Sequence, residues 1–332
     1  MFQVKRILFP TDFSPCANEA LDHALFLTRK YGATLHMLHA VVLHKDDPHN
    51  PAAHFADIDE IDRRLKDLAR IEMKASVRER AGDWHKIVME QRRGVSAAGV
   101  ALDYARDEEI DLIVMGTHGR RGLGRLFLGS VAEAVVRYAS QPVLTIRGDG
   151  RPNQPGRIRR ILVPVDFSEH SGDAIRHAGE IAATYGAGLD LLHVIEETPR
   201  PGFYDAVGCG LVGIADDLEE EAVAQMQQLY SSTNGSAVDV QYHAIVGNAR
   251  ETIIRFAEES GVGLIVIPTH GLSGLGPLLM GSVAEKVVRR APCPVLTLKA
   301  SGELLDGEVE MSPLSIERGT PGHPAPHRPC RH

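Results

Sequence analysis

The amino-acid sequence predicts an α/β protein made of two repeated, doubly wound parallel sheets. The chain has 332 residues, which is the length of two ordinary domains. Three segments of the sequence occur twice in the same order. Within each copy, short apolar runs alternate with amphipathic helical patterns, which is typical of parallel strands joined by helical crossovers. The two copies are therefore expected to fold alike.

The internal repeat is visible in three pairs of matching segments. The pairs are KRILFPTDFSPCANEAL (5–21) with RRILVPVDFSEHSGDAI (159–175), LHMLHAV (35–41) with LDLLHVI (189–195), and THGRRGLGRLFLGSVAEAVVRYASQPVLTI (117–146) with THGLSGLGPLLMGSVAEKVVRRAPCPVLTL (269–298). The spacing between the two members of a pair is nearly constant. The copies therefore differ by only a small net deletion.

Local patterns predict each element of the first copy. The apolar run at residues 4–9 predicts a short buried strand. Ser14 stands where it would cap the following helix, and Gly32 where that helix would end. The other expected strands are 34–42, 87–91, 112–115 and 143–146, and the other expected helices are 57–80, 96–106 and 130–138. This alternation predicts a parallel sheet that helices cover on both faces.

The repeats also predict the domain organisation. The expected units are a first domain at 1–148, a linker at 149–157, a second domain at 158–300 and a tail at 301–332. The linker is rich in glycine, proline and polar residues. The tail lacks sustained periodicity, so it is expected to be disordered. The last strands of the two domains, 143–146 and 295–298, are expected to pair, because apolar edge strands need covering.

The composition favours a globular protein of the reducing cytoplasm. The 36 lysines and arginines stand against 44 aspartates and glutamates, and the net charge of −8 argues against binding to nucleic acid. The four cysteines are far apart and form neither a zinc motif nor a disulfide framework. No apolar run approaches the roughly 18 residues of a membrane span, and the N-terminal residues do not resemble a signal peptide. We therefore expect a cytoplasmic protein with no membrane partner.

Candidate ligand-binding residues lie where strands end. Ligands of open parallel sheets bind outside the C-terminal ends of the strands. Asp12 follows the first strand, Ala40 ends the second, a glycine-rich run begins at Met115, and Gly129 and Ser130 begin a helix. The N-terminus of that helix presents unpaired N–H groups, which favour a phosphate. Two alternatives stay open: the glycines only permit tight turns with Ser130 as an ordinary N-cap, and Asp12 only caps the helix that follows it.

Three motifs together resemble the ATP-binding branch of the universal stress protein family. GTHGRRGLGRLFLGS fits the pattern G-x2-G-x9-G-[ST], FPTDFS stands near the start of the chain, and LHA lies in the second strand. The resemblance covers both repeats. It implies a Rossmann-like domain with flavodoxin-type strand order 3-2-1-4-5 and a nucleotide where the strand order reverses. It also implies that Asp12 contacts adenosine and that the backbone at Ala40 borders the adenine. The phosphates would be held by Gly116, Gly119, Gly129 and Ser130.

The resemblance assigns a candidate nucleotide site to each domain. In the first domain the site residues are Pro10, Thr11, Asp12, Ala40, Met115, Gly116, Gly119, Arg125, Gly129, Ser130 and Val131. In the second domain they are Pro164, Val165, Asp166, Val194, Ile267, Gly271, Gly281, Ser282 and Val283. The second copy departs from the pattern, because Pro268 replaces the first glycine and Pro277 replaces the cation Arg125. Proline has no N–H to donate, so we expect the first domain to bind ATP more tightly.

The implied function is that of a stress-response protein that binds ATP or another adenine nucleotide and acts as a sensor or regulatory module. The phosphates are expected to carry Mg²⁺, which phosphate oxygens and water usually hold. Further expected partners are a second copy of the chain, through the domain surfaces, and an unidentified regulatory protein. No catalytic residue and no protein-built metal site are predicted, so at most a weak ATP hydrolysis is expected. The alternatives are a slow ATPase or phosphotransferase using Asp12 or His118, and a structural pseudo-dimer without ligand.

Three weaker patterns receive other interpretations. Residues 208–213 spell GxGxxG, but no strand directly precedes them, so we interpret them as a flexible loop over the second site. His39 and His193, near strand ends, are interpreted as packing or hydrogen-bonding residues. Adventitious metal binding is the interpretation for the tail residues His323, His327, Cys330 and His332.

Overall fold

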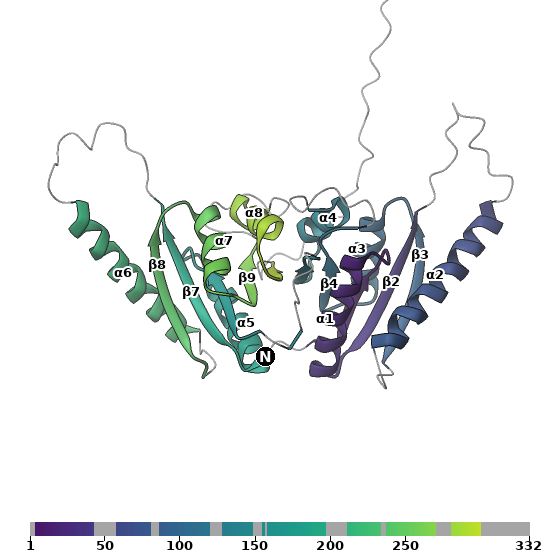
Figure 1. Cartoon of the computed structure of the whole chain (residues 1–332), viewed down its shortest axis with the longest axis horizontal. Coiled ribbons are helices and arrows are strands. Elements are labelled where there is room, and N and C mark those ends of the chain that lie inside the picture. Colours follow the sequence, from purple (N-terminus) through teal and green to yellow (C-terminus); the bar gives the residue numbers. More distant parts are fainter. Residues whose placement is uncertain are drawn as a thin grey trace, which may run out of the picture. The chain divides into compact units, whose positions relative to one another are not determined.

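Figure 1 shows the computed structural model of the chain. It describes residues 4–42, 58–80, 86–119, 128–148, 155–156, 158–196, 211–233, 237–269 and 280–299, with the backbone alone at 58–62, 79 and 211–216. Most of the expected linker and the whole expected tail lie outside these residues.

The first repeat alternates strands and helices as expected. Its strands are β1 (Arg6–Pro10), β2 (Thr34–Val42), β3 (Ile87–Gly94), β4 (Leu112–Gly116) and β5 (Val143–Ile146). Its helices are α1 (Pro15–Tyr31), α2 (Ile58–Arg80), α3 (Ala97–Asp107) and α4 (Ser130–Tyr138). The third strand is longer than expected, because all of β3 pairs with β2, from Leu35 opposite Ile87 to Val42 opposite Gly94.

The second repeat has the same order of elements. Its strands are β6 (Arg160–Pro164), β7 (Gly188–Ile195), β8 (Val240–Val246), β9 (Leu264–Pro268) and β10 (Val295–Leu298). Its helices are α5 (Glu169–Tyr185), α6 (Leu211–Ser232), α7 (Ala249–Glu259) and α8 (Ser282–Arg290). Leu211 to Gly213 begin α6, so this part of the expected 208–213 loop is helical, and the rest lies outside the described residues. None of the described helices is long and apolar enough to span a membrane.

The expected helix caps are confirmed. The Ser14 hydroxyl accepts a hydrogen bond from the Ala17 N–H at 3.2 Å and so satisfies one free donor at the start of α1. Gly32 ends the helix in the left-handed region, with φ of 67°, where a residue with a Cβ is strained. Ser168 and Gly186 do the same for α5 in the second repeat.

The strand order confirms the expected fold. All strands form one sheet in the order β3-β2-β1-β4-β5-β10-β9-β6-β7-β8, which contains the order 3-2-1-4-5 and its repeat. Pairing is parallel within each repeat and antiparallel between β5 and β10, where Leu144 lies opposite Leu296. The expected pairing of the two last strands is therefore confirmed.

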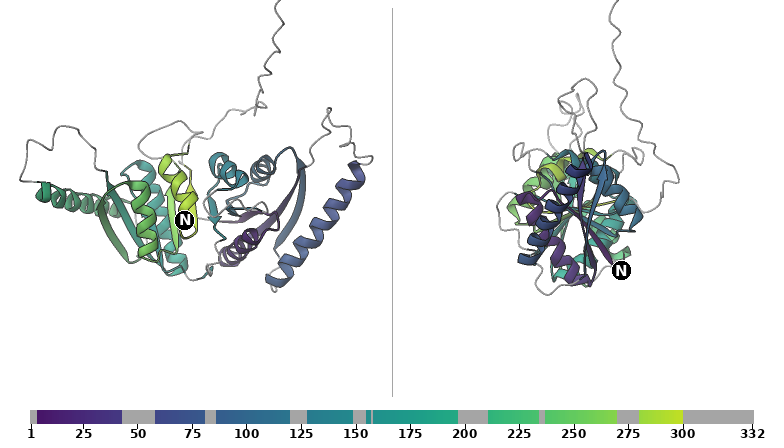
Figure 2. Two further views of the ribbon diagram at one scale, coloured as in Figure 1. Left: turned by 45° about the horizontal axis from the view of Figure 1, so that its top comes forward. Right: turned by 90° about the vertical axis from the view of Figure 1, so that its right-hand side faces the viewer.

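Helices lie on both faces of this sheet (Figure 2), and an apolar core fills the space on each face. The first core joins strand residues such as Ile7 to α1, α2, α5 and α6, and the second joins residues such as Leu8 to α3, α4, α7 and α8. Ile7 and Leu8 are adjacent and point to opposite faces, as the two-residue period of a strand requires. Each core contains residues of both repeats, so the hydrophobic interior continues across the β5–β10 junction.

Cations from each repeat contact the other repeat at equivalent positions. Arg147 follows β5 and donates to the Ala291 carbonyl at 3.3 Å, at the end of α8. Lys299 follows β10 and donates to the Arg137 carbonyl at 2.7 Å, in the last turn of α4. Cations are favourable at these ends, because helix C-termini carry partial negative charge. Burial lowers the pKa of Lys299 to about 8.

A buried carboxylate joins three strands of the second repeat. Asp190, on β7, is 3% exposed and accepts hydrogen bonds from Arg160 Nη2 at 2.6 Å and from His243 Nε2 at 3.0 Å. Burial raises the pKa of Asp190, but the hydrogen bonds from Arg160 and His243 together lower it by more, so the pKa lies below its ordinary value. Arg160 also pairs with Asp239 at 2.6 Å. Asp190 therefore stabilises the fold in its ionised form.

Replacing this carboxylate should destabilise the protein in a pH-dependent way. We expect Asp190→Asn to lower the free energy of unfolding by roughly 2–4 kcal/mol at pH 7, because Arg160 loses its buried partner. The pKa of Asp190 is lowered in the folded state, so its contribution is complete above the ordinary pKa of 3.8 and declines as the pH falls below it. Urea unfolding followed by circular dichroism at several pH values measures both effects.

Asp239→Asn is the matched control, because it removes the other carboxylate bound to Arg160. The Asp239 side chain is 72% exposed, so its loss should cost less than about 1 kcal/mol. Equal losses for the two variants would contradict a special contribution of Asp190.

Candidate functional site

The first candidate residues form a strained turn between β1 and α1. Thr11 continues the strand pairing, since its N–H donates to the Leu38 carbonyl at 2.9 Å. Asp12 Oδ1 accepts from the Ser14 N–H at 3.0 Å. Phe13, between them, has φ of 63°, a left-handed conformation that costs a residue with a side chain on the order of 1–3 kcal/mol. Ser14, and not Asp12, is therefore the N-cap of α1, and Asp12 accepts the N–H group of that cap residue.

A histidine on the neighbouring strand holds this turn. His39 Nδ1 lies 2.8 Å from the Thr11 carbonyl oxygen, which can only accept, so Nδ1 carries the proton. The His39 ring also packs against the Phe13 ring, with 4.7 Å between the centroids. His39 therefore both packs and donates a hydrogen bond, as expected from its place near the strand end.

The second repeat builds the same turn. His193 bonds to the Val165 carbonyl at 2.8 Å and packs on Phe167, whose φ is 60°. The role of the two phenylalanines was missed from the sequence. The triplet Asp-Phe-Ser, present in both copies, was the available signal.

The glycine-rich segment after β4 returns to this turn. A Cβ on Gly119 would lie 2.6 Å from Asp12 Oδ2, so the Gly119 backbone lies directly against the Asp12 carboxylate. The Ser14 hydroxyl also approaches the His118 carbonyl at 3.4 Å. The turn after β1 and the segment after β4 therefore meet at one point. This point is where the strand order reverses, since β1 lies between β2 and β4.

Gly116 and Gly129 are explained by close packing. A Cβ on Gly116 would lie 2.8 Å from Cys16 Sγ, and one on Gly129 would lie 3.0 Å from the Thr117 carbonyl oxygen. Within the described residues, Gly116, Gly119 and Gly129 do not have positive φ. Close approach, and not a left-handed turn, is thus the structural reason for glycine at these positions.

The N-terminus of α4 lies beside the same segment. The Gly129 N–H donates to the Thr117 carbonyl at 2.8 Å, and Gly129 is the N-cap residue with no side-chain cap. Ser130 is the first helical residue, so the alternative in which Ser130 is an ordinary N-cap is wrong. The N–H groups of Ser130 and Val131 belong to the first turn, where a helix supplies no acceptor. They are suited to an anion.

Three of the other first-site candidates lie on described strands. Pro10 ends β1, and Met115 is a buried residue of β4. Ala40 lies on β2, two residues beyond Leu38, whose carbonyl accepts the Thr11 N–H. Arg125 lies outside the described residues.

The second repeat differs at its aspartate. Asp166 Oδ1 accepts from the Ser168 N–H at 3.0 Å, the Ser168 hydroxyl at 2.6 Å and the Ser171 hydroxyl at 2.7 Å. The position of Ser171 in α5 is occupied by Ala17 in α1. The Asp166 carboxylate is therefore engaged by the serines of its own helix.

The rest of the second candidate site follows the first where it is described. Pro268 ends β9, and the Gly281 N–H donates to the Thr269 carbonyl at 2.8 Å, as Gly129 does to Thr117. Ser282 and Val283 begin α8. The other described candidates are Pro164 at the end of β6, Val165, Val194 on β7 and Ile267 on β9. Gly271 and Pro277 lie outside the described residues.

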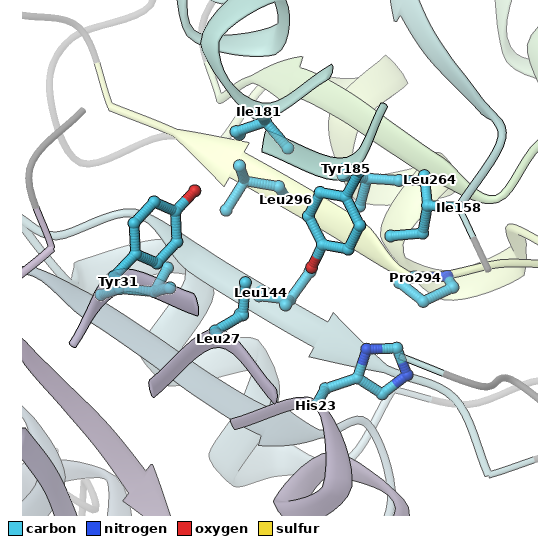
Figure 3. Close-up of a pocket in the computed structure, with 11 residues that line it drawn as sticks. His23, Leu27, Tyr31, Leu144, Ile158, Ile181, Tyr185, Leu264, Pro294 and Leu296 are labelled. Carbon is cyan, nitrogen blue, oxygen red and sulfur yellow. The ribbon is translucent and has the colours of Figure 1, made fainter. Parts of the chain in front are cut away.

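A separate cavity between the repeats is too small for a nucleotide (Figure 3). Its volume is about 20 Å³, which is room for about one water molecule. Burial raises the pKa of Tyr31 and of its counterpart Tyr185, so both hydroxyl groups stay neutral. The lining residues are His23, Leu27, Tyr31, Leu112, Leu144, Ile158, Ile181, Tyr185, Leu264, Pro294 and Leu296. This cavity belongs to the interface and not to the candidate site.

The sequence model of the universal stress protein family matches residues 3–147 and 157–299, so the chain belongs to this family. It is 27% identical over 220 residues to a universal stress protein of Mycolicibacterium smegmatis, covering 66% of this chain and 71% of the relative. A universal stress protein of Mycobacterium bovis is 23% identical over 304 residues, covering 88% and 94% of the two chains.

Solved structures agree with the fold. The crystal structure of a universal stress protein from Archaeoglobus fulgidus superposes with a TM-score of 0.63 at 23% identity. The superposition covers 90% of this chain and 97% of the other. The expected family and the expected fold class are thus confirmed, whereas the site residues stay predictions.

Gly116→Ala distinguishes packing from ligand contact at the first motif glycine. The new methyl group would meet Cys16 Sγ and the Cys16 backbone, which lies 3.1 Å away. We expect a loss of about 1–3 kcal/mol in the free energy of unfolding, measured by chemical denaturation. Adding Cys16→Ala should recover part of this loss, because it removes the sulfur. Unchanged stability together with weaker ATP binding would contradict the packing explanation.

Proposed function

We propose that the chain binds an adenine nucleotide, ATP foremost, in the first repeat and acts as a nucleotide-responsive module of the stress response. The observation that carries the proposal is the meeting of the Asp12 carboxylate with the Gly119 backbone, in the same loop system as the α4 N-terminus. These groups lie where ligands bind in open parallel sheets. Gly119 and the first residues at the α4 N-terminus belong to the G-x2-G-x9-G-S pattern.

The groups of the proposed site suit the two parts of a nucleotide. The first-turn N–H groups and the hydroxyl of Ser130 would hold phosphate oxygens. An ionised Asp12 only accepts hydrogen bonds, which suits the hydroxyl groups of a ribose. Ala40, Thr11 and Met115 would border the base. Arg125 would add a cation near the phosphates.

Mg²⁺ would enter with the nucleotide. Within the described residues no cluster of three histidine, cysteine or acidic side chains is arranged to hold a metal ion. The phosphates and water would therefore supply most of the ligands, as is usual for this ion. In the proposed function Mg²⁺ accompanies ATP and is not a resident cofactor.

Binding without rapid turnover is the proposed activity. Asp12 accepts the Ser14 N–H, and His118 Nδ1 lies 2.8 Å from the Thr117 hydroxyl, so both candidate bases have local partners. A slow ATPase is the second candidate function, and repeated ADP release that disappears in Asp12→Ala would favour it. ATP retained without turnover would favour the binding module.

Protein partners would use surfaces other than the last strands. β5 and β10 cover each other, and β3 and β8 are the outermost strands of the sheet. A homodimer or a regulatory protein would therefore bind elsewhere than at β5 or β10. We propose the cytoplasm as the location, because the described cysteines Cys16 and Cys293 are buried free thiols.

Mass spectrometry of the ligand released from gently purified, then denatured protein tests the proposal most directly. It distinguishes ATP, AMP, another ligand and none. Calorimetric titration of the full chain with ATP and Mg²⁺ then gives the number of sites. Absence of any adenine nucleotide in both measurements would refute the proposal.

Ser130→Asp should block the first cleft without damaging the fold. A carboxylate at the first residue of α4 is favourable to the helix but repels a phosphate. We expect ATP binding at the first cleft to be lost and the thermal midpoint to be unchanged or slightly raised. Ser130→Ala, the control, should bind more weakly than the unmodified chain but still bind, because it loses the hydroxyl contact and keeps the N–H groups. ATP affinity of Ser130→Asp equal to that of the unmodified chain would show that the phosphates lie elsewhere.

A further inference from the structure

Helix α2 has a second apolar stripe besides the one that packs on the sheet. It consists of Leu65, Leu68 and Ile71, which follow one another at three-residue spacing and so lie along one side of the helix. Leu68 is 60% exposed and Ile71 is 63% exposed within the described part of the chain. The helix packs on the sheet through other residues, such as the buried Ala69 and Met73. Figure 1 shows α2 beside β3, the outermost strand of the first repeat.

The equivalent helix of the second repeat lacks this α2 stripe. The buried Ala-x-x-x-Met pair of α2 recurs in α6, so the two helices can be aligned. In this alignment α6 has Glu221 in place of Leu68 and Ala224 in place of Ile71, and both α6 residues are exposed. Packing of the helix on the sheet therefore does not require large apolar residues at these positions. The α2 stripe is suited to a contact outside its own repeat.

Charged residues flank the α2 stripe in a self-complementary pattern. Arg64 precedes Leu68 by one helical turn, Glu72 follows it by one turn, and both side chains are exposed. In a two-fold pair of antiparallel helices, residues at equal distances from the axis meet each other. With the axis at Leu68, Arg64 of each copy would lie beside Glu72 of the other, and Leu65 beside Ile71. Cation would thus meet anion, and apolar residues would meet apolar residues.

The charge of the whole helix also favours α2 as the partner of α2. Its sequence contains nearly equal numbers of cations and carboxylates, whereas α6 contains carboxylates and no cation. Two copies of α6 would repel each other, and two copies of α2 would not. Among the described residues of α6, Leu218 is the only large apolar residue that is exposed. An α6 helix would therefore cover the α2 stripe less well than a second α2 helix.

We propose that the α2 stripe is the contact surface of a homodimer, in which α2 packs antiparallel on α2 of a second copy of the chain. The contact is isologous, so it closes after two copies. β5 and β10 already pair within one chain and are not needed for it. A single pair of helices is a small interface, so the dimer should dissociate on dilution. The inference does not depend on the proposed function, because α2 contains none of the candidate nucleotide-binding residues.

Sedimentation velocity of the full chain at several concentrations tests the dimer. The unmodified chain should change from monomer to dimer as its concentration rises. Leu68→Asp should weaken dimerisation about tenfold or more, because it places a carboxylate at the apolar centre of the contact. Its thermal midpoint should equal that of the unmodified chain at concentrations where both are monomeric. Leu218→Asp on α6 is the matched control and should leave dimerisation unchanged.

Exchanging the flanking charges tests the antiparallel arrangement. Arg64→Glu alone and Glu72→Arg alone should each weaken the dimer, because like charges then meet. The double variant should recover most of the affinity, because opposite charges meet again. Arg64 and Glu72 lie about 12 Å apart along one helix, so this recovery requires a second copy.

The inference would be overturned by a chain that stays monomeric at every concentration, or by a double charge variant that recovers no affinity. Unchanged dimerisation of Leu68→Asp would place the contact elsewhere. A lower thermal midpoint of Leu68→Asp without loss of the dimer would show that the chain covers the stripe itself. Loss of the dimer in Leu218→Asp would instead assign α6 of another copy to the stripe. None of these results depends on ATP, so this inference and the proposed function fail separately.

Discussion

The antiparallel pairing of β5 with β10 is the interaction on which the rest of the structure depends. Both strands are buried along their whole length, and each would otherwise be the open apolar edge of a five-stranded sheet. The Thr145 hydroxyl donates to the Val295 carbonyl at 3.1 Å and the Thr297 hydroxyl to the Val143 carbonyl at 3.2 Å. These side-chain bonds reinforce the junction from both strands.

The junction also brings together helices from the two candidate sites. It brings α4 and α8 together, and Arg289 of α8 lies 3.3 Å from Glu133 of α4. Glu133 is in the first turn of α4, the same turn that is suited to an anion. The helices whose N-termini belong to the candidate sites therefore also contact each other across the junction. A shift of one helix on ligand binding would act directly on the other.

Much of the fold was predictable because the relevant signals are local or repeated. The strand periodicity, the Ser14 and Gly32 caps and the duplicated segments placed the elements within a few residues of their observed bounds. The hydrogen bond between Arg250 and Ser282 was not predictable, because it joins residues from different helices and the first copy has alanine at the equivalent position. The left-handed Phe13 was also missed, because phenylalanine has no propensity for that conformation. Packing around His39 and the turn imposes it.

Because the two repeats are linked in one chain, their candidate sites can acquire different residues. In a homodimer of identical chains, every substitution appears in both binding sites, so neither can change without the other. Here both strands of the junction lie on one chain, and each candidate site is formed by a different part of the sequence. Pro268 and Arg250 occur in the second repeat only, and the first repeat has Gly116 and Ala98 at the equivalent positions. The pseudo-symmetric scaffold thus permits two chemically different sites while keeping a single hydrophobic interior.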